Sequence, residues 1–265
     1  MIIKTPLHSS TLLLVLLLFI ILCIGSCKKP GSNDEITFED GNGLTDLEGN
    51  YYPSIILGNG QEWMAVNLKT SKYANGDLIT NALSDVVWSN ASSGAWCNYE
   101  NDPQNDEIYG KLYNWHALIG DTLHLMRIID NTNTNSKDTI FYDSIPCKIC
   151  PDGWRMPYED DWIDLINYLG NANVAGGKMK DTSLQYWKSP NLSATNESGF
   201  SGLPGGQRNS NGSFEYVTEI GRWWCFEDVY EDYAHTRPLL YDQETTLNHY
   251  VYRKEGGLSV RLIKK

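Results

Sequence analysis

Hydrophobic and polar residues alternate over short distances in most of this chain, which predicts many short strands and few helices. One segment, residues 158–169, has clear helical periodicity. Its apolar residues recur on one face: Trp162, Ile163, Ile166 and Leu169. Acidic residues at 159–161 suit the first turn of a helix, and Gly170 is a common helix end. A helix over 158–169 is therefore expected, with a shorter one over 172–180.

The remaining pattern predicts strands separated by turns. A polar hairpin turn at 46–51 precedes the strand-like segment 54–57, and a second turn at 58–60 leads into residues 61–68. Further strands are expected at 213–218, 221–226, 237–241, 247–253 and 257–263. The fold class that follows is α+β, with one or two helices packed on a twisted, mainly antiparallel sheet with long loops.

The N-terminus differs from the rest of the chain. An uninterrupted apolar run, Leu12–Ile24, follows Lys4 and His8. The run is shorter than the roughly 20 residues that span a membrane, and it fits the apolar core of a secretory signal. The run ends in Ile24-Gly25-Ser26-Cys27, which resembles the lipobox of bacterial lipoproteins.

The lipobox resemblance implies cleavage before Cys27 and acylation of that residue, for example with palmitate. A plain signal peptide or an N-terminal anchor helix with an incidental cysteine is the alternative. The predicted organisation is a signal peptide over 1–26, a lipidated cysteine with a flexible tether over 27–44, and one domain over 45–265. The implied partner is a membrane, reached through the lipid, with the bacterial outer membrane as the expected location.

Charge and composition narrow the class of protein. The chain has 33 acidic and 21 basic residues, a net charge of -12, which argues against a nucleic-acid partner because phosphate binding needs clustered Lys and Arg. A hydrophobic fraction of 41% excludes a wholly disordered chain. Aromatic residues make up 12%, which is high.

Four cysteines remain after the signal and the lipid site: Cys97, Cys147, Cys150 and Cys225. In an exported protein they suggest two disulfides, for which three pairings exist. The spacing of Cys147 and Cys150 also occurs in redox and zinc sites, but a turn follows the pair and no second ligand pair lies nearby in the sequence. Free buried thiols are the remaining alternative.

Signs of catalysis are weak. No two histidines have the spacing of a helical zinc pair, and neither a nucleophile elbow nor a phosphate-binding loop occurs. Glu227 and Asp228 could serve calcium or acid–base chemistry, although a solvated acidic loop is the simpler interpretation. No metal, cofactor or catalytic residue is predicted, and the protein is not expected to be an enzyme.

Six ordered motifs carry a resemblance to a known family. They are QEWMAVNL (61–68), YGKLYNW (109–115), CPDGWRMP (150–157), GGKMK (176–180), NESGFSGLPGG (196–206) and GLSVR (257–261). Together they resemble the Fibrobacter succinogenes major paralogous domain, found in secreted and lipid-anchored bacterial proteins. The resemblance covers about residues 45–264 and implies a C-type-lectin-like fold, a superfamily that also contains formylglycine-generating enzymes. It implies no general activity.

The chain departs from the family pattern at an insertion over 120–146, at Tyr158 and at Cys225. The insertion could carry a ligand contact or decorate a loop. Because Cys97 and Cys150 lie in family-like motifs, we expect them to form a disulfide, leaving Cys147 and Cys225 as a second pair or as free thiols.

Aromatic residues in polar segments after Gly199 favour a binding function, because flat rings stack on sugars and anchor protein interfaces. The ligand-binding candidates are Trp223, Trp224, Glu227, Asp228, Tyr230 and Tyr233. Neighbouring side chains of a strand face opposite ways, so we expect one of the two tryptophans in the core and the other on the ligand face. The site is expected in the loops at 204–213 and 226–236.

The function expected from the sequence is a lipid-anchored cell-envelope module for binding or adhesion, recognising a glycan or an envelope protein without catalysis. Alternatives are an enzyme, a hydrolase or oxidase, on the same scaffold, and a structural component of the envelope.

Overall fold

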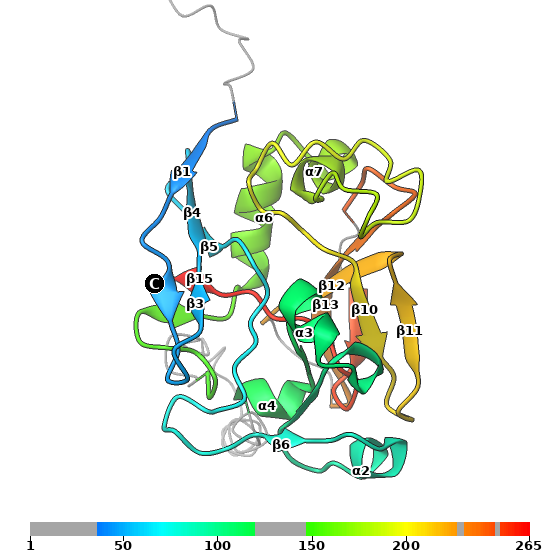
Figure 1. Cartoon of the computed structure of the whole chain (residues 1–265). Helices are drawn as coiled ribbons and strands as arrows, with labels where there is room; N and C mark the ends of the chain where they lie inside the picture. The colour runs from blue at the N-terminus through cyan, green and yellow to red at the C-terminus, as the bar shows by residue number, and fades with distance from the viewer. Residues whose placement is uncertain (1–35, 120–146, 227–230, 247–249) are drawn as a thin grey trace, which may run out of the picture. The chain divides into compact units, whose positions relative to one another are not determined.

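The computed structural model describes residues 36–119, 147–226, 231–246 and 250–265. The chain divides into two units, residues 1–35 and residues 36–265, and every element below belongs to the second (Figure 1). The predicted signal peptide, Cys27 and the 120–146 insertion lie outside the described residues. Within the described part, no helix is both long enough and apolar enough to cross a lipid bilayer.

The largest sheet joins the two ends of the folded unit. Its five strands are antiparallel, in the order β1 (Phe38–Asp40), β4 (Ser54–Leu57), β5 (Glu62–Met64), β15 (Ile263–Lys264) and β9 (Trp154–Arg155). The C-terminal strand therefore lies between strands from the first and middle parts of the chain. A short hairpin, β2 (Leu44–Thr45) with β3 (Tyr51–Tyr52), precedes β4 and forms at the predicted turn.

Three smaller sheets complete the strands. Their members are β12 (Ile220–Trp224), β13 (Tyr233–Leu240) and β14 (Tyr250–Arg253); β10 (Gly205–Arg208) and β11 (Phe214–Val217); and β6 (Thr80–Asn81), β7 (Ala95–Cys97) and β8 (Leu112–Tyr113). All pairs are antiparallel except β6 with β7. The α+β class is thus confirmed, with short strands and long connections.

The α-helices are short. They are α2 (Asp85–Ser89), α3 (Gln104–Tyr109), α4 (Trp115–Ile119), α6 (Glu159–Tyr168) and α7 (Ala172–Met179). The predicted helices over 158–169 and 172–180 are α6 and α7. Asp161 stabilises the first turn of α6. Its carboxylate accepts a hydrogen bond from the Tyr158 backbone N–H at 2.6 Å and pairs with Arg155.

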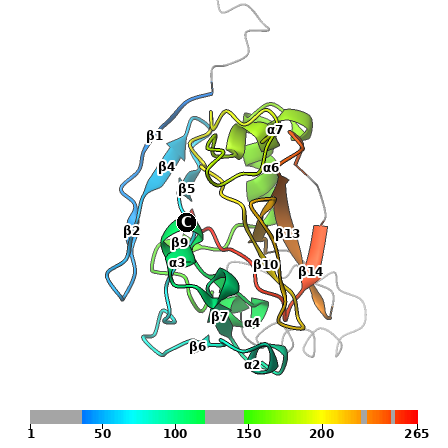
Figure 2. The same cartoon turned by 45° about the vertical axis from the view of Figure 1, so that its right-hand side comes forward.

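Helix α6 lies between the five-stranded sheet and the β12–β14 sheet (Figure 1, Figure 2). Its Trp162, Leu165 and Ile166 are buried against residues of both sheets. Ile163, expected on the same apolar face, is instead 39% exposed. Neighbouring residues of a helix point in different directions. The face that meets the core contains residues 162, 165 and 166, and Ile163 lies beside that face.

The strand expected over 257–263 is wrong for most of its length. Only Ile263 of this segment belongs to a strand, and residues 257–259 make isolated bridges to three different partners. Every residue from 257 to 263 is buried. The segment runs through the interior, where Leu258 bridges to Tyr113 and Ser259 bridges to Trp223. Because successive residues bridge to different strands, the segment connects sheets and does not pair with one neighbouring strand along its length.

The core contains most of the tryptophan residues. Seven of the nine tryptophans are less than 2% exposed: Trp63, Trp88, Trp115, Trp162, Trp187, Trp223 and Trp224. Most of their ring contacts are edge to face or tilted, as in the pair Trp63 and Trp162 at 4.8 Å between centroids, and Trp115 is stacked on Phe226. The tryptophans are therefore mainly structural residues.

The expected disulfide between Cys97 and Cys150 is wrong. Cys147 is bonded to Cys150, with 5.3 Å between their Cα atoms, while Cys97 and Cys225 are buried thiols that form no disulfide. Cys97 lies in β7 within a separate apolar cluster beside Trp88. Burial there raises the pKa of the Cys97 thiol to about 12, so it stays protonated at neutral pH.

Lys180 is a completely buried cation that holds three segments together. Its ammonium group donates to the backbone carbonyls of Leu192, Leu240 and Gln243 at 2.8–2.9 Å. Burial lowers the pKa of Lys180 to about 8, against the opposing effect of Asp242 and Glu244. The group is therefore still charged at neutral pH.

We expect Lys180→Met to destabilise the fold by about 3–5 kcal/mol, because it leaves buried carbonyls without donors. Urea unfolding followed by tryptophan fluorescence measures the change. Lys188→Met is the matched control, since Lys188 is an exposed lysine paired with Glu219, and it should change stability little. Equal effects of the two substitutions would contradict the role given to Lys180.

Candidate functional site

Two of the cavities on the surface of the described residues are candidate sites. The first, here the tyrosine cleft, has a volume of about 260 Å³. It is lined by Tyr51, Tyr52, Pro53, Ala65, Val66, Asn67, Lys69, Asp106, Glu107, Ile108, Gly110, Asp181, Tyr186, Ser201, Leu203 and Arg261. The second, here the Lys72 cavity, has a volume of about 420 Å³ and lies between the β2–β3 hairpin, residues 70–74 and residues 149–154.

The floor of the tyrosine cleft is a buried polar network around Arg261. The Asn67 side-chain oxygen accepts hydrogen bonds from the Trp223 indole N–H at 2.8 Å and from Arg261 Nε at 2.9 Å. Arg261 also donates to the carbonyls of Phe200 and Ser201. Complete burial lowers the pKa of Arg261 to about 9, which leaves the guanidinium charged at neutral pH. The floor is therefore rigid and positively charged.

The rim of the cleft presents tyrosine rings and aliphatic groups to solvent. Tyr51, from β3, is 58% exposed, and Tyr186 lies edge-on to Tyr109 at 6.5 Å. Gly43 makes room for Tyr51: its φ is +67°, and a Cβ there would lie 2.6 Å from the Tyr51 hydroxyl. Ile108 and Val66 are also exposed. The cleft thus combines flat rings with a polar floor.

Two of the three carboxylates that line the cleft are paired with lysines. Asp106 lies 2.7 Å from Lys111, and Glu107 lies 3.2 Å from Lys69. Lys111 itself is held over the Trp96 ring at 4.6 Å. Asp181 accepts a hydrogen bond from the Ser183 backbone N–H. Together with Arg261, the two lysines balance the three carboxylates, so the cleft has little net charge.

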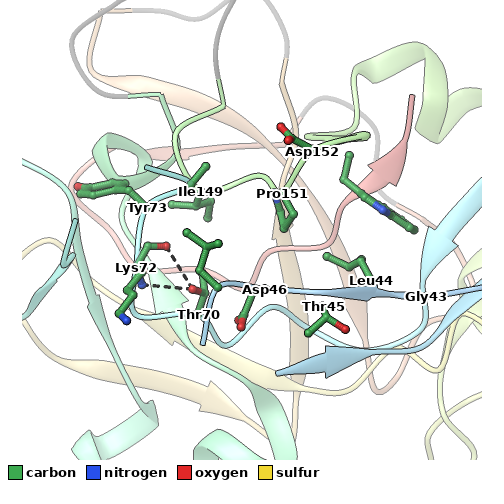
Figure 3. Close-up of a pocket in the computed structure, with 13 residues that line it drawn as sticks. Gly43, Leu44, Thr45, Asp46, Thr70, Lys72, Tyr73, Ile149, Pro151 and Asp152 are labelled. Carbon is green, nitrogen blue, oxygen red and sulfur yellow. Dashed lines mark hydrogen bonds between the residues drawn. The ribbon is translucent and has the colours of Figure 1, made fainter. Parts of the chain in front are cut away.

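The lining of the Lys72 cavity includes Tyr73, Ile149 and Pro151 beside Lys72 and Asp152 (Figure 3). Its Asp46 belongs to the hairpin turn. The Asp46 carboxylate accepts hydrogen bonds from the Tyr52 hydroxyl at 2.7 Å and from Glu48 and Asn50. Burial would raise the pKa of Asp46, but these hydrogen bonds outweigh it and hold the pKa below its ordinary value. Asp46 is therefore a structural acid.

The hairpin is fixed from its other side by Glu48. The Glu48 carboxylate accepts hydrogen bonds from the Ser71 backbone N–H and hydroxyl, both at 2.5 Å, and from the Thr70 hydroxyl at 3.1 Å. The β2–β3 hairpin, which lines part of each cavity, is therefore held in place against residues 70–71. Among the described residues, no group of three or more His, Cys, Asp or Glu side chains is placed to bind a metal ion.

The two candidate tryptophans are both buried, so the expectation that one of them faces a ligand is wrong. Trp223 packs on Phe200 at 5.4 Å, and Trp224 packs on Trp115 at 5.4 Å and donates to the Tyr113 carbonyl. The alternation of the strand is as expected, but both faces of β12 are covered by core.

The other ligand-binding candidates give no support to a site at 226–236. Glu227, Asp228 and Tyr230 lie outside the described residues. Tyr233, at the start of β13, is 37% exposed and lies over Arg253 at 5.5 Å. Neither Tyr233 nor the tryptophans line either cavity. The three described candidates therefore contribute no contact to either cavity.

The residues that do line the tyrosine cleft were only partly visible in the sequence. Four of the six motifs contribute to it, through Val66, Gly110, Ser201 and Arg261 among others. These motifs signalled the family but not the cavity. Tyr51 and Tyr186 lie in polar segments that are 135 positions apart in the sequence. No local sequence pattern indicates that both segments line one cavity.

The folded unit is thus an α+β module with open concave sites and a rigid core. The chain belongs to the Fibrobacter succinogenes major domain family, whose model matches residues 57–264. Comparison with curated proteins and with solved structures gave no match. Residues 36–56 precede the family match, yet they form β1, β2, β3 and most of β4 and contribute a wall to both cavities.

We expect Trp223→Ala and Trp224→Ala each to destabilise the protein by about 3–5 kcal/mol, because each removes a buried indole from a different core cluster. Thermal and urea unfolding measure the loss. Tyr233→Ala is the control, as a partly exposed aromatic residue in the neighbouring strand, and should cost far less. If either tryptophan variant were as stable as the control, its burial would be refuted.

Proposed function

We propose that this protein is a non-catalytic binding module of the bacterial cell envelope that recognises a neutral glycan in the tyrosine cleft. The proposal includes a lipid anchor at Cys27, an outer-membrane location and a C-type-lectin-like arrangement of the folded unit. The observation that carries it is the cleft itself: the exposed Tyr51 and the half-buried Tyr186 line it together with paired charges and the polar network around Arg261.

The chemistry of the cleft suits a sugar. The apolar faces of a sugar ring stack on aromatic rings such as those of Tyr51 and Tyr186, which lose little conformational entropy on binding. Sugar hydroxyls need both donors and acceptors, and Asn67, Ser201 and Asp181 supply such groups around the cleft. A volume of about 260 Å³ suits one or two sugar rings better than a large folded partner.

The charge balance favours a neutral ligand. Asp106 and Glu107 are each paired with a lysine, and the third cleft carboxylate, Asp181, is offset by Arg261 in the floor. A strongly anionic or cationic ligand would break these pairs and leave a charge uncompensated. The net charge of -12 adds a general repulsion of anionic polymers.

The same pairs argue for binding over hydrolysis. A glycoside hydrolase needs two carboxyl groups, one able to donate a proton and one able to attack or to activate water. In the cleft, Asp106 and Glu107 are each in contact with a lysine ammonium group, so neither carboxylate is an unpaired group that faces the cleft. The described thiols that are not in a disulfide, Cys97 and Cys225, are buried in the core. An oxidase or hydrolase is therefore the weaker candidate.

The glycan proposal is tested with the full chain in detergent on an array of neutral and charged glycans. Any neutral glycan that binds is then titrated against Tyr51→Ala and Tyr186→Ala, each expected to weaken affinity about tenfold by removing a stacking ring. Tyr216→Ala, which removes an exposed ring outside both cavities, is the control and should bind normally. Binding that is insensitive to both cleft variants, or restricted to charged glycans, would refute the proposed site.

The lipid anchor is tested separately in cells fed labelled palmitate. We expect label on the wild-type protein and none on Cys27→Ser, because the lipobox thiol is the acceptor. Cys23→Ser is the matched control, since that cysteine lies in the predicted signal peptide and should leave labelling unchanged. Labelled Cys27→Ser protein would show that acylation occurs elsewhere.

A further inference from the structure

Ser201 lines the tyrosine cleft in a backbone conformation that is uncommon for serine. Its φ is +50°, in the left-handed region, where the Cβ of any residue other than glycine crowds the following carbonyl oxygen. A residue keeps such a conformation only where its surroundings hold it, and positions of this kind cluster at binding sites. Ser201 is half-buried, so it is a held residue on a surface that a ligand can touch.

The backbone around Ser201 is fixed by buried donors. Arg261 donates to the carbonyl of Phe200 and, at 3.0 Å, to the carbonyl of Ser201. On the other side, the carbonyl of Gly202 accepts from the buried Trp187 indole N–H at 3.0 Å. Three consecutive carbonyls are therefore bound from the core. The side chain of Ser201 keeps one direction because its backbone cannot turn without breaking these bonds.

Asn196 fixes the Ser201 side chain as well. The side-chain oxygen of Asn196 accepts from the Ser201 backbone N–H at 2.8 Å, and its amide nitrogen donates to Ser201 Oγ at 2.9 Å. A backbone N–H can only donate, so the first bond settles which end of the amide is oxygen. Ser201 Oγ donates its own proton to the Gly199 carbonyl at 3.3 Å. One lone pair of Oγ is left, and this hydroxyl can therefore only accept a further hydrogen bond.

The cations that line or border the cleft already contact protein acceptors. Lys69 lies 3.2 Å from Glu107, and Lys111 lies 2.7 Å from Asp106. Ser201 differs from them because its proton is directed to the protein and its remaining lone pair is not. A ligand hydroxyl can donate to that lone pair, whereas an ether oxygen or an O-methyl group cannot.

We propose that Ser201 determines the selectivity of the tyrosine cleft, by accepting a hydrogen bond from one free hydroxyl of the bound glycan. Asn196 does not line the cleft and acts as a positioning residue, which keeps the Ser201 proton turned toward Gly199. This inference rests on the proposed function and narrows its ligand class. The cleft accepts glycans with a free hydroxyl at one ring position and discriminates against sugars that are deoxygenated or O-alkylated there.

The probes are maltose, cellobiose, lactose and mannobiose, titrated against the full chain in a detergent without a sugar headgroup. The disaccharide that binds most tightly is then compared with its monodeoxy analogues. We expect the wild type to lose about tenfold in affinity at one ring position, as for the loss of one hydrogen bond. Ser201→Ala should bind the parent sugar about tenfold more weakly and should bind that analogue equally well, because neither complex contains the bond.

Asn196→Ala tests the positioning role. It should reduce the discrimination between the parent sugar and the same analogue, and it should cause no further loss in a Ser201→Ala background. Ser193→Ala is the matched control: Ser193 also has a left-handed φ, +55°, and its hydroxyl bonds to Glu244 at 2.7 Å outside both cavities. Its affinity and discrimination should equal those of the wild type.

Ser201→Gly separates the lost hydroxyl from a disturbed backbone. Glycine adopts a φ of +50° without crowding, so this variant should be at least as resistant to urea as Ser201→Ala and should discriminate no better. If Ser201→Ala and Asn196→Ala weaken the parent sugar and every analogue by the same factor, both residues are merely structural and the proposal is overturned.

The remaining outcomes distinguish this inference from the proposed function. If Tyr51→Ala and Tyr186→Ala weaken binding while Ser201→Ala discriminates as the wild type does, the selectivity role is wrong and the glycan site stands. If the tyrosine variants bind like the wild type, the site and this inference fail together. If none of the four disaccharides binds, this inference is overturned, whatever the glycan array shows for the proposed function.

Discussion

The folded unit depends on the burial of one full positive charge, that of Arg261. A guanidinium removed from water is costly unless its donors are all used. Here the side-chain oxygen of Asn67 and the carbonyls of Phe200 and Ser201 accept from it, and the ring of Phe200 lies 4.0 Å from its centre. To satisfy this charge, segments around residues 67, 200 and 261 must meet at one point, which sets the path of the closing segment.

The same device recurs where the chain has no regular structure. Arg208 donates to the Ala82 and Gly212 carbonyls, and Lys180 donates to three carbonyls from two separate segments. Short strands and long connections leave many backbone carbonyls without ladder partners, and a buried carbonyl without a donor is costly. Buried cations supply several donors from one side chain. The protein therefore uses arginine and lysine where a more regular fold would use strand pairing.

Local patterns in the sequence predicted local structure well. Helix α6 and the turn at 58–60 follow from the spacing of a few neighbouring residues, and the structure has both. The closing segment and the fate of Trp223 and Trp224 depend on what lies across the core. The separation of Cys97 from Cys150, which lie in different apolar clusters, depends on the tertiary structure in the same way. Alternation correctly placed the two tryptophans on opposite faces of β12, but it carries no information on whether a second layer covers each face.

The candidate site was hidden for a related reason. Its floor comes from residues that the motifs contain, but its rim comes from Tyr51 and Tyr186, which are remote in sequence and lie in polar segments. Tyr51 belongs to residues 36–56, which the family match does not include. Knowledge of the family alone therefore gives the floor of the cleft without its most exposed ring.

This division between floor and rim separates stability from selectivity. Arg261 and Asn67 serve the core, so substitutions there would unfold the protein before they changed its ligand. The β2–β3 hairpin is fixed by contacts that leave this network alone: Asp46 caps its own turn, and Glu48 binds Ser71. Tyr51 and its neighbours can therefore change without loss of the fold. Surface loops on a rigid scaffold are where binding specificity can vary at least structural cost.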